Sequence, residues 1–169
     1  MKIVYIIEAL SNSGGMERVV TQKANWLADK AYQDVSIVTF AQHSDIDDFF
    51  QLSDNVKRVK INLKDFDKKK LSLFLTEWLK DNPQDICIST YGREFSILPQ
   101  LEDGSKKIVE FHFAYDINKH WLANSCSKLK TSLVGAVKTW LMTRTAKKYD
   151  KIVCLTTVSY THLTLPTIA

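Results

Sequence analysis

Cysteine is scarce in this chain, and the three present lie far apart, at positions 87, 126 and 154. An odd number of cysteines, without Cys-x-x-Cys spacing or a paired histidine, disfavours a disulfide framework, a metal site and an activated thiol. Glycine and proline are also few, with five and three residues, and no linker or internal repeat divides the 169 residues. The sequence therefore predicts one domain with buried, reduced cysteines and no metal site.

Long apolar runs are absent as well. No segment reaches the roughly 18 apolar residues that a membrane-spanning helix needs. The chain starts with Met1-Lys2-Ile3-Val4, which enters a strand directly and is not a cationic leader. A composition of 45% apolar and 25% charged residues is typical of soluble globular proteins. These features predict a cytoplasmic protein without a transmembrane anchor.

Acidic residues are missing from one long stretch, between Ile117 and Tyr149. The cations of this stretch are Lys119, Lys128, Lys130, Lys138, Arg144, Lys147 and Lys148. Aliphatic residues recur in this stretch at helical spacing, namely Leu129, Leu133, Val137 and Leu141. They predict a helix whose aliphatic side faces the core and whose basic side faces the solvent. The alternative is peripheral adsorption to the anionic inner face of a membrane. Nucleic acid is not an expected partner, because no recognition motif accompanies the basic residues.

Strand-like and helix-like segments alternate along the chain. Strands are predicted at Lys2–Glu8, Asp34–Phe40, Val56–Leu63, Asp85–Thr90, Lys106–Phe113 and Lys151–Leu155. Helices are predicted at Met16–Lys30, Phe66–Lys80 and about Ser125–Lys148. This alternation predicts an α/β, Rossmann-like three-layer domain, with a mostly parallel sheet of about six strands and helices on both faces. Ligands of such sheets bind beyond the carboxyl ends of the strands.

A short glycine turn follows the first predicted strand. The run Ser11-Asn12-Ser13-Gly14-Gly15-Met16-Glu17-Arg18 separates the apolar segment Ile3–Ile7 from an amphipathic helix. Glycines let the backbone approach a ligand closely, and the unpaired N–H groups of a first helical turn attract anions. The turn lacks the third glycine of a dinucleotide fingerprint, and Phe40-Ala41-Gln42 supplies no acid at the end of the second strand. A nicotinamide-dependent oxidoreductase is therefore a weaker alternative, and no cofactor is expected.

The run from Glu8 to Val20, centred on Gly14-Gly15-Met16-Glu17-Arg18, resembles the first loop of glycosyltransferase family 4. Val109-Glu110-Phe111-His112-Phe113 resembles the end of that family's fifth strand, and the segment Tyr149–Thr156 resembles the strand that completes its N-terminal domain. The resemblance covers residues 1–157. It implies the N-terminal, acceptor-side half of a B-type enzyme with two Rossmann-like domains. Such an enzyme transfers a hexose from a nucleotide sugar to an acceptor hydroxyl with retention of configuration.

By this resemblance, Gly14 and Gly15 contact the phosphates or the transferred sugar of the donor. Their backbone N–H groups would stabilise the diphosphate leaving group as negative charge develops on it. Glu17 is either a further ligand contact or a carboxylate that stabilises the first helical turn. Arg18 is either a phosphate contact or an exposed helix residue.

His112 is the candidate catalytic residue, because the resemblance places it at a strand end that faces the cleft. It is expected to bind the transferred sugar or to position the acceptor hydroxyl, and a general-base role is the alternative. Glu110, two residues earlier, lies on the same side of the strand and is expected to orient the imidazole. Arg93, in the loop after the fourth strand, is another candidate ligand contact at this edge.

The resemblance ends before the last residues of the chain. Residues 158–169 contain no Lys, Arg, Asp or Glu and resemble translated sequencing-adapter read-through, so we expect a non-native tail. The family's donor-binding C-terminal domain is expected to be missing, and the fragment alone to be inactive. The expected partners of the intact enzyme are a nucleotide sugar and a glycan or lipid-linked acceptor, in cell-surface polysaccharide or lipid-linked glycan synthesis. The alternative from another class is a stand-alone, non-catalytic Rossmann-like binding module for an anionic ligand.

Overall fold

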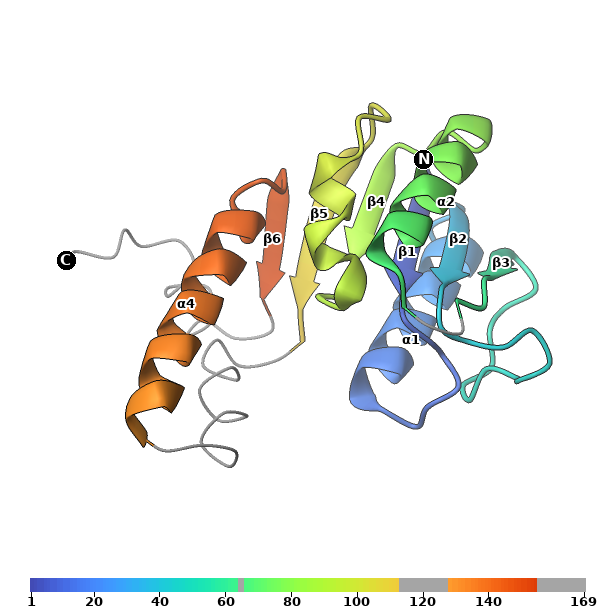
Figure 1. The fold of residues 1–169 in the computed structure, drawn as a ribbon. Coiled ribbons are helices and arrows are strands. Elements are labelled where there is room, and N and C mark those ends of the chain that lie inside the picture. Colours follow the sequence, from blue (N-terminus) through green and yellow to red (C-terminus); the bar gives the residue numbers. More distant parts are fainter. Residues whose placement is uncertain (64–65, 113–127, 155–169) are drawn as a thin grey trace.

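Six parallel strands form the centre of the computed structural model, which describes residues 1–63, 66–112 and 128–154. The strands are β1 (Lys2–Ile7), β2 (Asp34–Thr39), β3 (Val56–Lys60), β4 (Ile86–Ser89), β5 (Lys106–Phe111) and β6 (Lys151–Cys154). Their order across the sheet is β3-β2-β1-β4-β5-β6, and each pair of neighbours is parallel (Figure 1). This is the predicted Rossmann-like arrangement, and its topological switch point lies between β1 and β4.

Helices connect these strands as crossovers. The α-helices among the described residues are α1 (Gly15–Asp29), α2 (Lys68–Asp81) and α4 (Lys128–Ala146). Two short 3₁₀ helices that the sequence did not predict follow β4, namely η1 (Arg93–Ser96) and η2 (Leu98–Gln100). Asp67 begins α2 as its N-cap, since its carboxylate accepts hydrogen bonds from the backbone N–H groups of Lys69 and Lys70. The predictions for residues 113–127 and 155–169, including the tail and the domain boundary near residue 157, lie outside the described residues.

Alternate residues of each strand pack on opposite faces of the sheet, so the core has two parts. One part lies under α1 and joins sheet residues such as Tyr5 to Val20 and Ala24 of the helix. The other lies under α2, η1 and α4. Its members include Val4, Ile6, Leu71, Leu75, Phe95, Met142, Ala146 and Tyr149. The predicted three layers, with helices on both faces of the sheet, are therefore confirmed.

The face that α4 turns toward the sheet differs from the prediction. Val137 and Leu141, expected in the core, are 55% and 48% exposed, while Leu129 and Leu133 have no described side chains. Among the residues of α4 whose burial is described, Gly135, Met142 and Ala146 are buried instead. Met142 and Ala146 pack in the core cluster that contains Phe95 and Tyr149. Val137 and Leu141 of the predicted stripe therefore lie on the outside of the molecule.

Two leucines on α2 provide a matched test of this packing. Leu75 is fully buried, whereas Leu73 is 64% exposed. We expect Leu75→Ala to lower the free energy of unfolding by about 2–5 kcal/mol, because it removes apolar contacts and leaves a cavity. Leu73→Ala should change it by less than about 0.5 kcal/mol. Urea unfolding followed by circular dichroism measures both values, and equal losses would contradict this assignment of the core.

Candidate functional site

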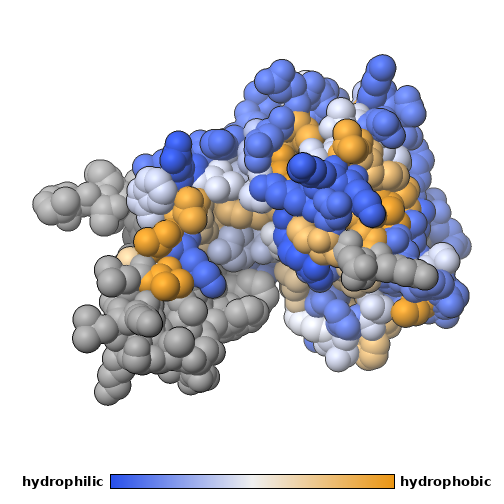
Figure 2. Space-filling view, in the orientation of Figure 1, coloured by the Kyte–Doolittle hydropathy of each residue, from blue (hydrophilic) through white to orange (hydrophobic). Residues whose placement is uncertain are grey.

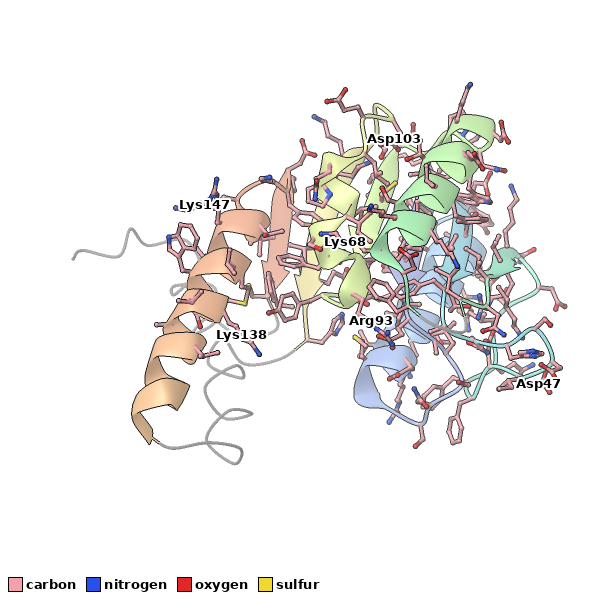
Figure 3. The ribbon with its side chains drawn as sticks, in the orientation of Figure 1. Asp47, Lys68, Arg93, Asp103, Lys138 and Lys147 are labelled. Atoms are coloured by element: carbon pink, nitrogen blue, oxygen red, sulfur yellow. The ribbon has the colours of Figure 1, made fainter. Side chains whose placement is uncertain are left out.

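The carboxyl ends of all six strands meet at one edge of the sheet. The glycine turn follows β1, Arg93 follows β4, and His112 follows β5 at this edge. In Figure 3, Arg93 lies at one end of the sheet, and Asp103, which precedes β5, lies at the opposite end. The topology thus brings the predicted site residues to a common edge, although they are up to about a hundred positions apart in the sequence.

The glycine turn forms the start of α1. Gly14 is the N-cap residue and has an extended conformation. Because it has no side chain, it makes no capping hydrogen bond to the first turn of the helix. The carboxylate of Glu17 folds back against Gly14, and a Cβ atom at position 14 would overlap it. Gly15 has open space around the position where a Cβ would stand. The two glycines therefore differ: Gly14 makes room for Glu17, while Gly15 leaves the backbone accessible from outside.

The polar residues next to these glycines lie in contrasting surroundings. Glu17 is 8% exposed, and the Asn12 side-chain amide lies 3.5 Å from its Oε1 atom. Its position in the first turn is favourable for a carboxylate, because the helix dipole attracts negative charge there. Arg18 is exposed on the next position of the same turn. Both residues remain near the predicted anion site, with Glu17 held inward and Arg18 outward.

Glu110 and His112 form a buried pair at the end of β5. The Nε2 atom of His112 lies 3.3 Å from Glu110 Oε2, and both side chains are less than a tenth exposed. The two atoms are close enough for an ion pair, but their geometry is not that of a hydrogen bond. Neither imidazole nitrogen has a hydrogen-bond partner. The two side chains thus lie next to each other, and His112 Nδ1 is buried without a protein partner.

Lys23 of α1 is the third member of this group, and no sequence pattern predicted it. Its Nζ atom lies 2.9 Å from both carboxylate oxygens of Glu110, 87 positions away. Burial raises the pKa of Glu110, but the contacts with His112 and Lys23 outweigh it, and the net pKa lies below its usual range. The Glu110 charge in turn adds to burial in raising the pKa of the Tyr5 hydroxyl. Glu110 is therefore an ionised carboxylate at neutral pH.

Two unpartnered hydroxyl groups lie on the same face of the sheet as this pair. The hydroxyl oxygens of Thr21 and Thr90 are buried and have no hydrogen-bond partner. Because Ser89 pairs with Val109, Thr90 continues β4 at the level of Glu110. Thr21 lies two residues before Lys23 on α1, and both buried hydroxyls add hydrogen-bonding capacity that the protein itself does not use.

Arg93 is held by protein groups. Its guanidinium forms an ion pair with Glu8, which follows β1, and lies 4.8 Å above the ring of Phe66. The hydrogen bond to Glu8 raises the pKa of Arg93. A ligand anion would therefore have to compete with Glu8 for this guanidinium.

Glu94 is a site residue that the sequence analysis missed. It is fully buried, and its Oε1 accepts hydrogen bonds from the Ser89 hydroxyl at 2.7 Å and from the Thr90 and Gly92 N–H groups at 3.1 and 2.9 Å. Its Oε2 has no partner. Burial raises the pKa of this carboxyl well above its usual range. A Cβ at Gly92 would overlap Glu94, so this carboxyl shapes the turn that leads to Arg93.

A second polar network supports the segment before the glycine turn. Arg58 of β3 donates to Asp48 at 2.8 Å and to Gln42 Oε1 at 3.1 Å. The same Gln42 oxygen accepts a hydrogen bond of 2.7 Å from the backbone N–H of Leu10. These contacts fix the loop after β2 against the chain that leads into the turn.

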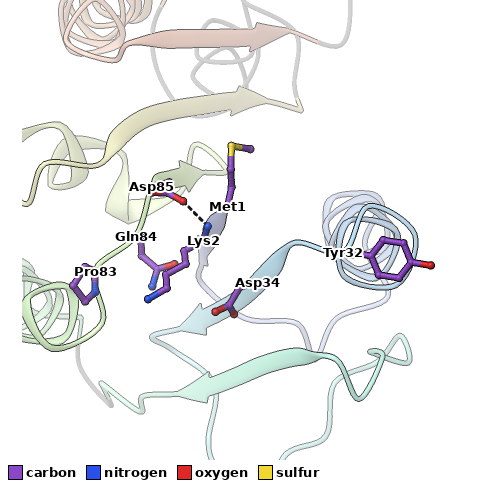
Figure 4. Close-up of a pocket in the computed structure, with 7 residues that line it drawn as sticks. All are labelled: Met1, Lys2, Tyr32, Asp34, Pro83, Gln84 and Asp85. Carbon is purple, nitrogen blue, oxygen red and sulfur yellow. Dashed lines mark hydrogen bonds between the residues drawn. The ribbon is translucent and has the colours of Figure 1, made fainter.

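Concave surfaces occur at both edges of the sheet. The one in Figure 4, of about 430 Å³, lies at the amino-terminal edge and is lined by Met1, Lys2, Tyr32, Asp34, Pro83, Gln84 and Asp85. This pocket lies at the opposite end of the strands from the predicted site and is therefore not part of that site. A groove of about 260 Å³ between η1 and α4 lies beside Tyr91 at the end of β4.

Within the described ranges, no cluster of His, Cys, Asp and Glu could hold a metal ion.

Comparison with known proteins finds the fold but no sequence family. No protein-family model and no curated protein matches the chain. The lipopolysaccharide outer core galactosyltransferase WaaB, in its apo form, matches with a TM-score of 0.64 and 16% identity, over 98% of this chain and 43% of that one. Sucrose-phosphate synthase from Thermosynechococcus elongatus matches with a TM-score of 0.56 and 14% identity, over 82% and 40%. The chain thus spans less than half the length of either structure, and it shares their Rossmann-like fold.

The two buried glutamates are expected to respond to pH in opposite directions. The pKa of Glu110 is lowered in the folded state. Its contribution to stability is therefore complete above the unfolded-state value of about 4.3 and is lost as the pH falls through the folded-state value. The pKa of Glu94 is raised. Its contribution is complete below about 4.3 and is lost as the pH rises through the folded-state value.

Glutamine variants measure these contributions, since glutamine keeps an acceptor oxygen and removes the charge. Unfolding free energies of wild type, Glu110→Gln and Glu94→Gln should be compared between about pH 3 and pH 8. The advantage of wild type over Glu110→Gln should shrink on acidification, and its advantage over Glu94→Gln should shrink on alkalinisation. If the advantage of wild type over both variants shrank in the same direction of pH, the opposite pKa shifts of Glu110 and Glu94 would be contradicted.

Proposed function

We propose that this chain is the N-terminal, acceptor-side half of a retaining glycosyltransferase of the family 4 type. The intact enzyme would transfer a hexose from a nucleotide sugar to an acceptor hydroxyl. The observation that carries the proposal is the common edge shared by the glycine turn of α1 and the buried Glu110–His112 pair of β5. The fold shared with a galactosyltransferase and with a sucrose-phosphate synthase supports it.

The glycine turn would stabilise the donor side of the reaction. Gly15 leaves the first N–H groups of α1 accessible, and these groups favour the negative charge that develops on a diphosphate leaving group. The carboxylate of Glu17 occupies the space beside Gly14 and would repel a phosphate there. We therefore assign the anion to the side of Gly15 and Arg18, and hydroxyl groups of the transferred sugar to Glu17.

His112 would act on the hydroxyl side. Its Nδ1 nitrogen is buried and has no partner, so it can accept a hydrogen bond from a sugar or acceptor hydroxyl. The nearby hydroxyls of Thr21 and Thr90 can bind further hydroxyl groups in the same way. In this proposal, the nucleotide of the donor is held by a C-terminal domain outside this chain, and the natural sequence diverges from this one after about residue 157.

We further propose that α4 contacts an anionic membrane surface, where a lipid-linked acceptor would be found. Figure 2 shows apolar residues gathered over the part of the surface that α4 forms. The exposed apolar residues of the helix are Val134, Val137, Trp140 and Leu141. Arg144 stacks on the Trp140 ring at 5.4 Å, and Lys138 and Lys147 lie on or next to the helix (Figure 3). Apolar side chains flanked by cations suit a surface of lipid tails and anionic headgroups. Among the described helices, none has the length and apolar character to span a bilayer.

Transfer activity is expected from the complete reading frame and not from residues 1–169 alone. The complete protein should release nucleoside diphosphate from one member of a panel of nucleotide sugars. His112→Ala should lower kcat by about 10²–10⁴, the usual size of a positioned acid–base contribution. The control is His43→Ala, since the His43 side chain is about half exposed, in the loop after β2. Full activity of His112→Ala, or turnover by residues 1–169 alone, would refute the proposal.

Membrane contact is tested by co-sedimentation of the chain with lipid vesicles. Binding should be stronger to vesicles that contain phosphatidylglycerol than to pure phosphatidylcholine. Lys147→Gln and Lys148→Gln should each weaken it about fivefold, because one cation near an anionic surface contributes about 1 kcal/mol. Trp140→Ser should weaken binding, whereas Trp26→Ser, which changes an equally exposed tryptophan on α1, should not. Equal effects of the two tryptophan variants would exclude α4 as the contact.

A further inference from the structure

We propose that Lys23 is a positioning residue for His112, which it orients through Glu110. By holding both carboxylate oxygens, Lys23 keeps an ionised Glu110 in front of the Nε2 nitrogen, so the imidazole carries its proton on Nε2 and presents its lone pair on Nδ1. The assignment of a ligand to that lone pair rests on the proposed function, but the arrangement itself does not.

The contacts of Lys23 show that it compensates the charge of Glu110. Its ammonium is 2.9 Å from both oxygens, which is the geometry of a charge-assisted, two-point contact. The Glu110 side chain is 7% exposed, while that of Lys23 is 40% exposed. A carboxylate buried to this degree is strongly destabilised without a partner, and it would take up a proton instead. Lys23 is thus what allows an ionised oxygen to face His112.

Titratable groups on three elements act on the Glu110 carboxylate. From β1 the titratable group that acts on it is the hydroxyl of Tyr5, from α1 it is Lys23, and from β5 it is His112. Tyr5 is neutral at ordinary pH, because burial and the Glu110 charge both raise its pKa. The protonation pattern at this point therefore depends on these groups together.

The position of the imidazole proton follows from this arrangement. A neutral histidine has one donor and one acceptor nitrogen, and the group that faces each nitrogen decides between the two tautomers. The ionised oxygen of Glu110 at 3.3 Å from Nε2 can only accept, so it favours a proton on Nε2. Nδ1 is buried and has no protein partner that would favour the other tautomer. The lone pair on Nδ1 is then the group offered to a hydroxyl.

Lys23 also couples the two ends of the site. It lies on α1, the same helix whose first turn carries the two glycines, and it reaches the strand that carries His112. A change in the position of α1 would therefore move the anion-binding end of the helix and the Glu110 carboxylate together.

The test is a two-bond ¹H–¹⁵N correlation spectrum of the histidine rings in the whole chain, which reports the tautomer of each ring directly. His112→Gln identifies the signals of His112. Wild type should show the Nε2–H tautomer at His112. In Lys23→Met the tautomer ratio should fall at least about tenfold, since a Glu110 carboxyl that takes up a proton no longer attracts the Nε2 proton electrostatically.

Two further variants separate this role from a general effect of charge. Lys23→Arg should restore the Nε2–H tautomer, because arginine can make the same two-point contact. Lys57→Met is the matched control, since Lys57 pairs with Asp34 at 2.9 Å near the other end of the sheet. It should leave the His112 signals unchanged.

A Lys23→Met variant that does not fold would be replaced by the double variant Lys23→Met with Glu110→Gln, which leaves no uncompensated charge. This variant should fold and lose the tautomer preference, because an amide can either donate to Nε2 or accept from it. An Nδ1–H tautomer in wild type, or an unchanged ratio in Lys23→Met or in the double variant, would overturn the proposal. Because these spectra need no substrate, they remain informative even where the complete protein shows no transfer activity.

Discussion

The ion pair between Lys23 and Glu110 is the contact on which the arrangement of the site depends. It joins α1, whose first turn carries the glycines, to β5, whose end carries His112, over 87 positions of sequence. The carboxylate is buried and is paired with a cation, so the contact ties the helix to the strand. The other site residues lie nearby because all six strands are parallel, which brings their carboxyl ends to the same edge of the sheet.

Acidic groups are prominent at this edge. Glu8 holds Arg93, Glu17 lies against Gly14, and Glu110 holds Lys23. Carboxyl groups are acceptors that suit the hydroxyl groups of a sugar better than phosphates, and the cations Lys23 and Arg93 are engaged by two of them. The accessible backbone at Gly15 is the contrasting, anion-favouring feature. This distribution supports the proposal that this edge of the sheet forms the acceptor side of a transfer site.

The sheet, its parallel order and the helices could be predicted because apolar periodicity determines them locally. The side-chain contacts could not. Lys23 has the sequence pattern of any solvated helical lysine, and its partner is brought near only by the fold. Glu94 lies in the short 3₁₀ helix η1, and no sequence pattern there indicates complete burial. The aliphatic residues of α4 predicted a buried stripe, but Met142 and Ala146 pack in the core instead, and Val137 and Leu141 lie outside it. Such outcomes depend on packing between distant elements, which no sequence pattern contains.

In the proposed function, the glycine turn and His112 form one binding edge for a nucleotide sugar and a hydroxyl acceptor. A titration of the ¹⁵N-labelled chain with a nucleoside diphosphate sugar at high concentration, with the backbone amide signals assigned, tests this most directly. The chemical-shift changes should be concentrated at Gly14, Gly15, Arg18 and His112. Shifts confined to Lys2, Asp34 and Asp85, at the opposite edge of the sheet, would contradict it.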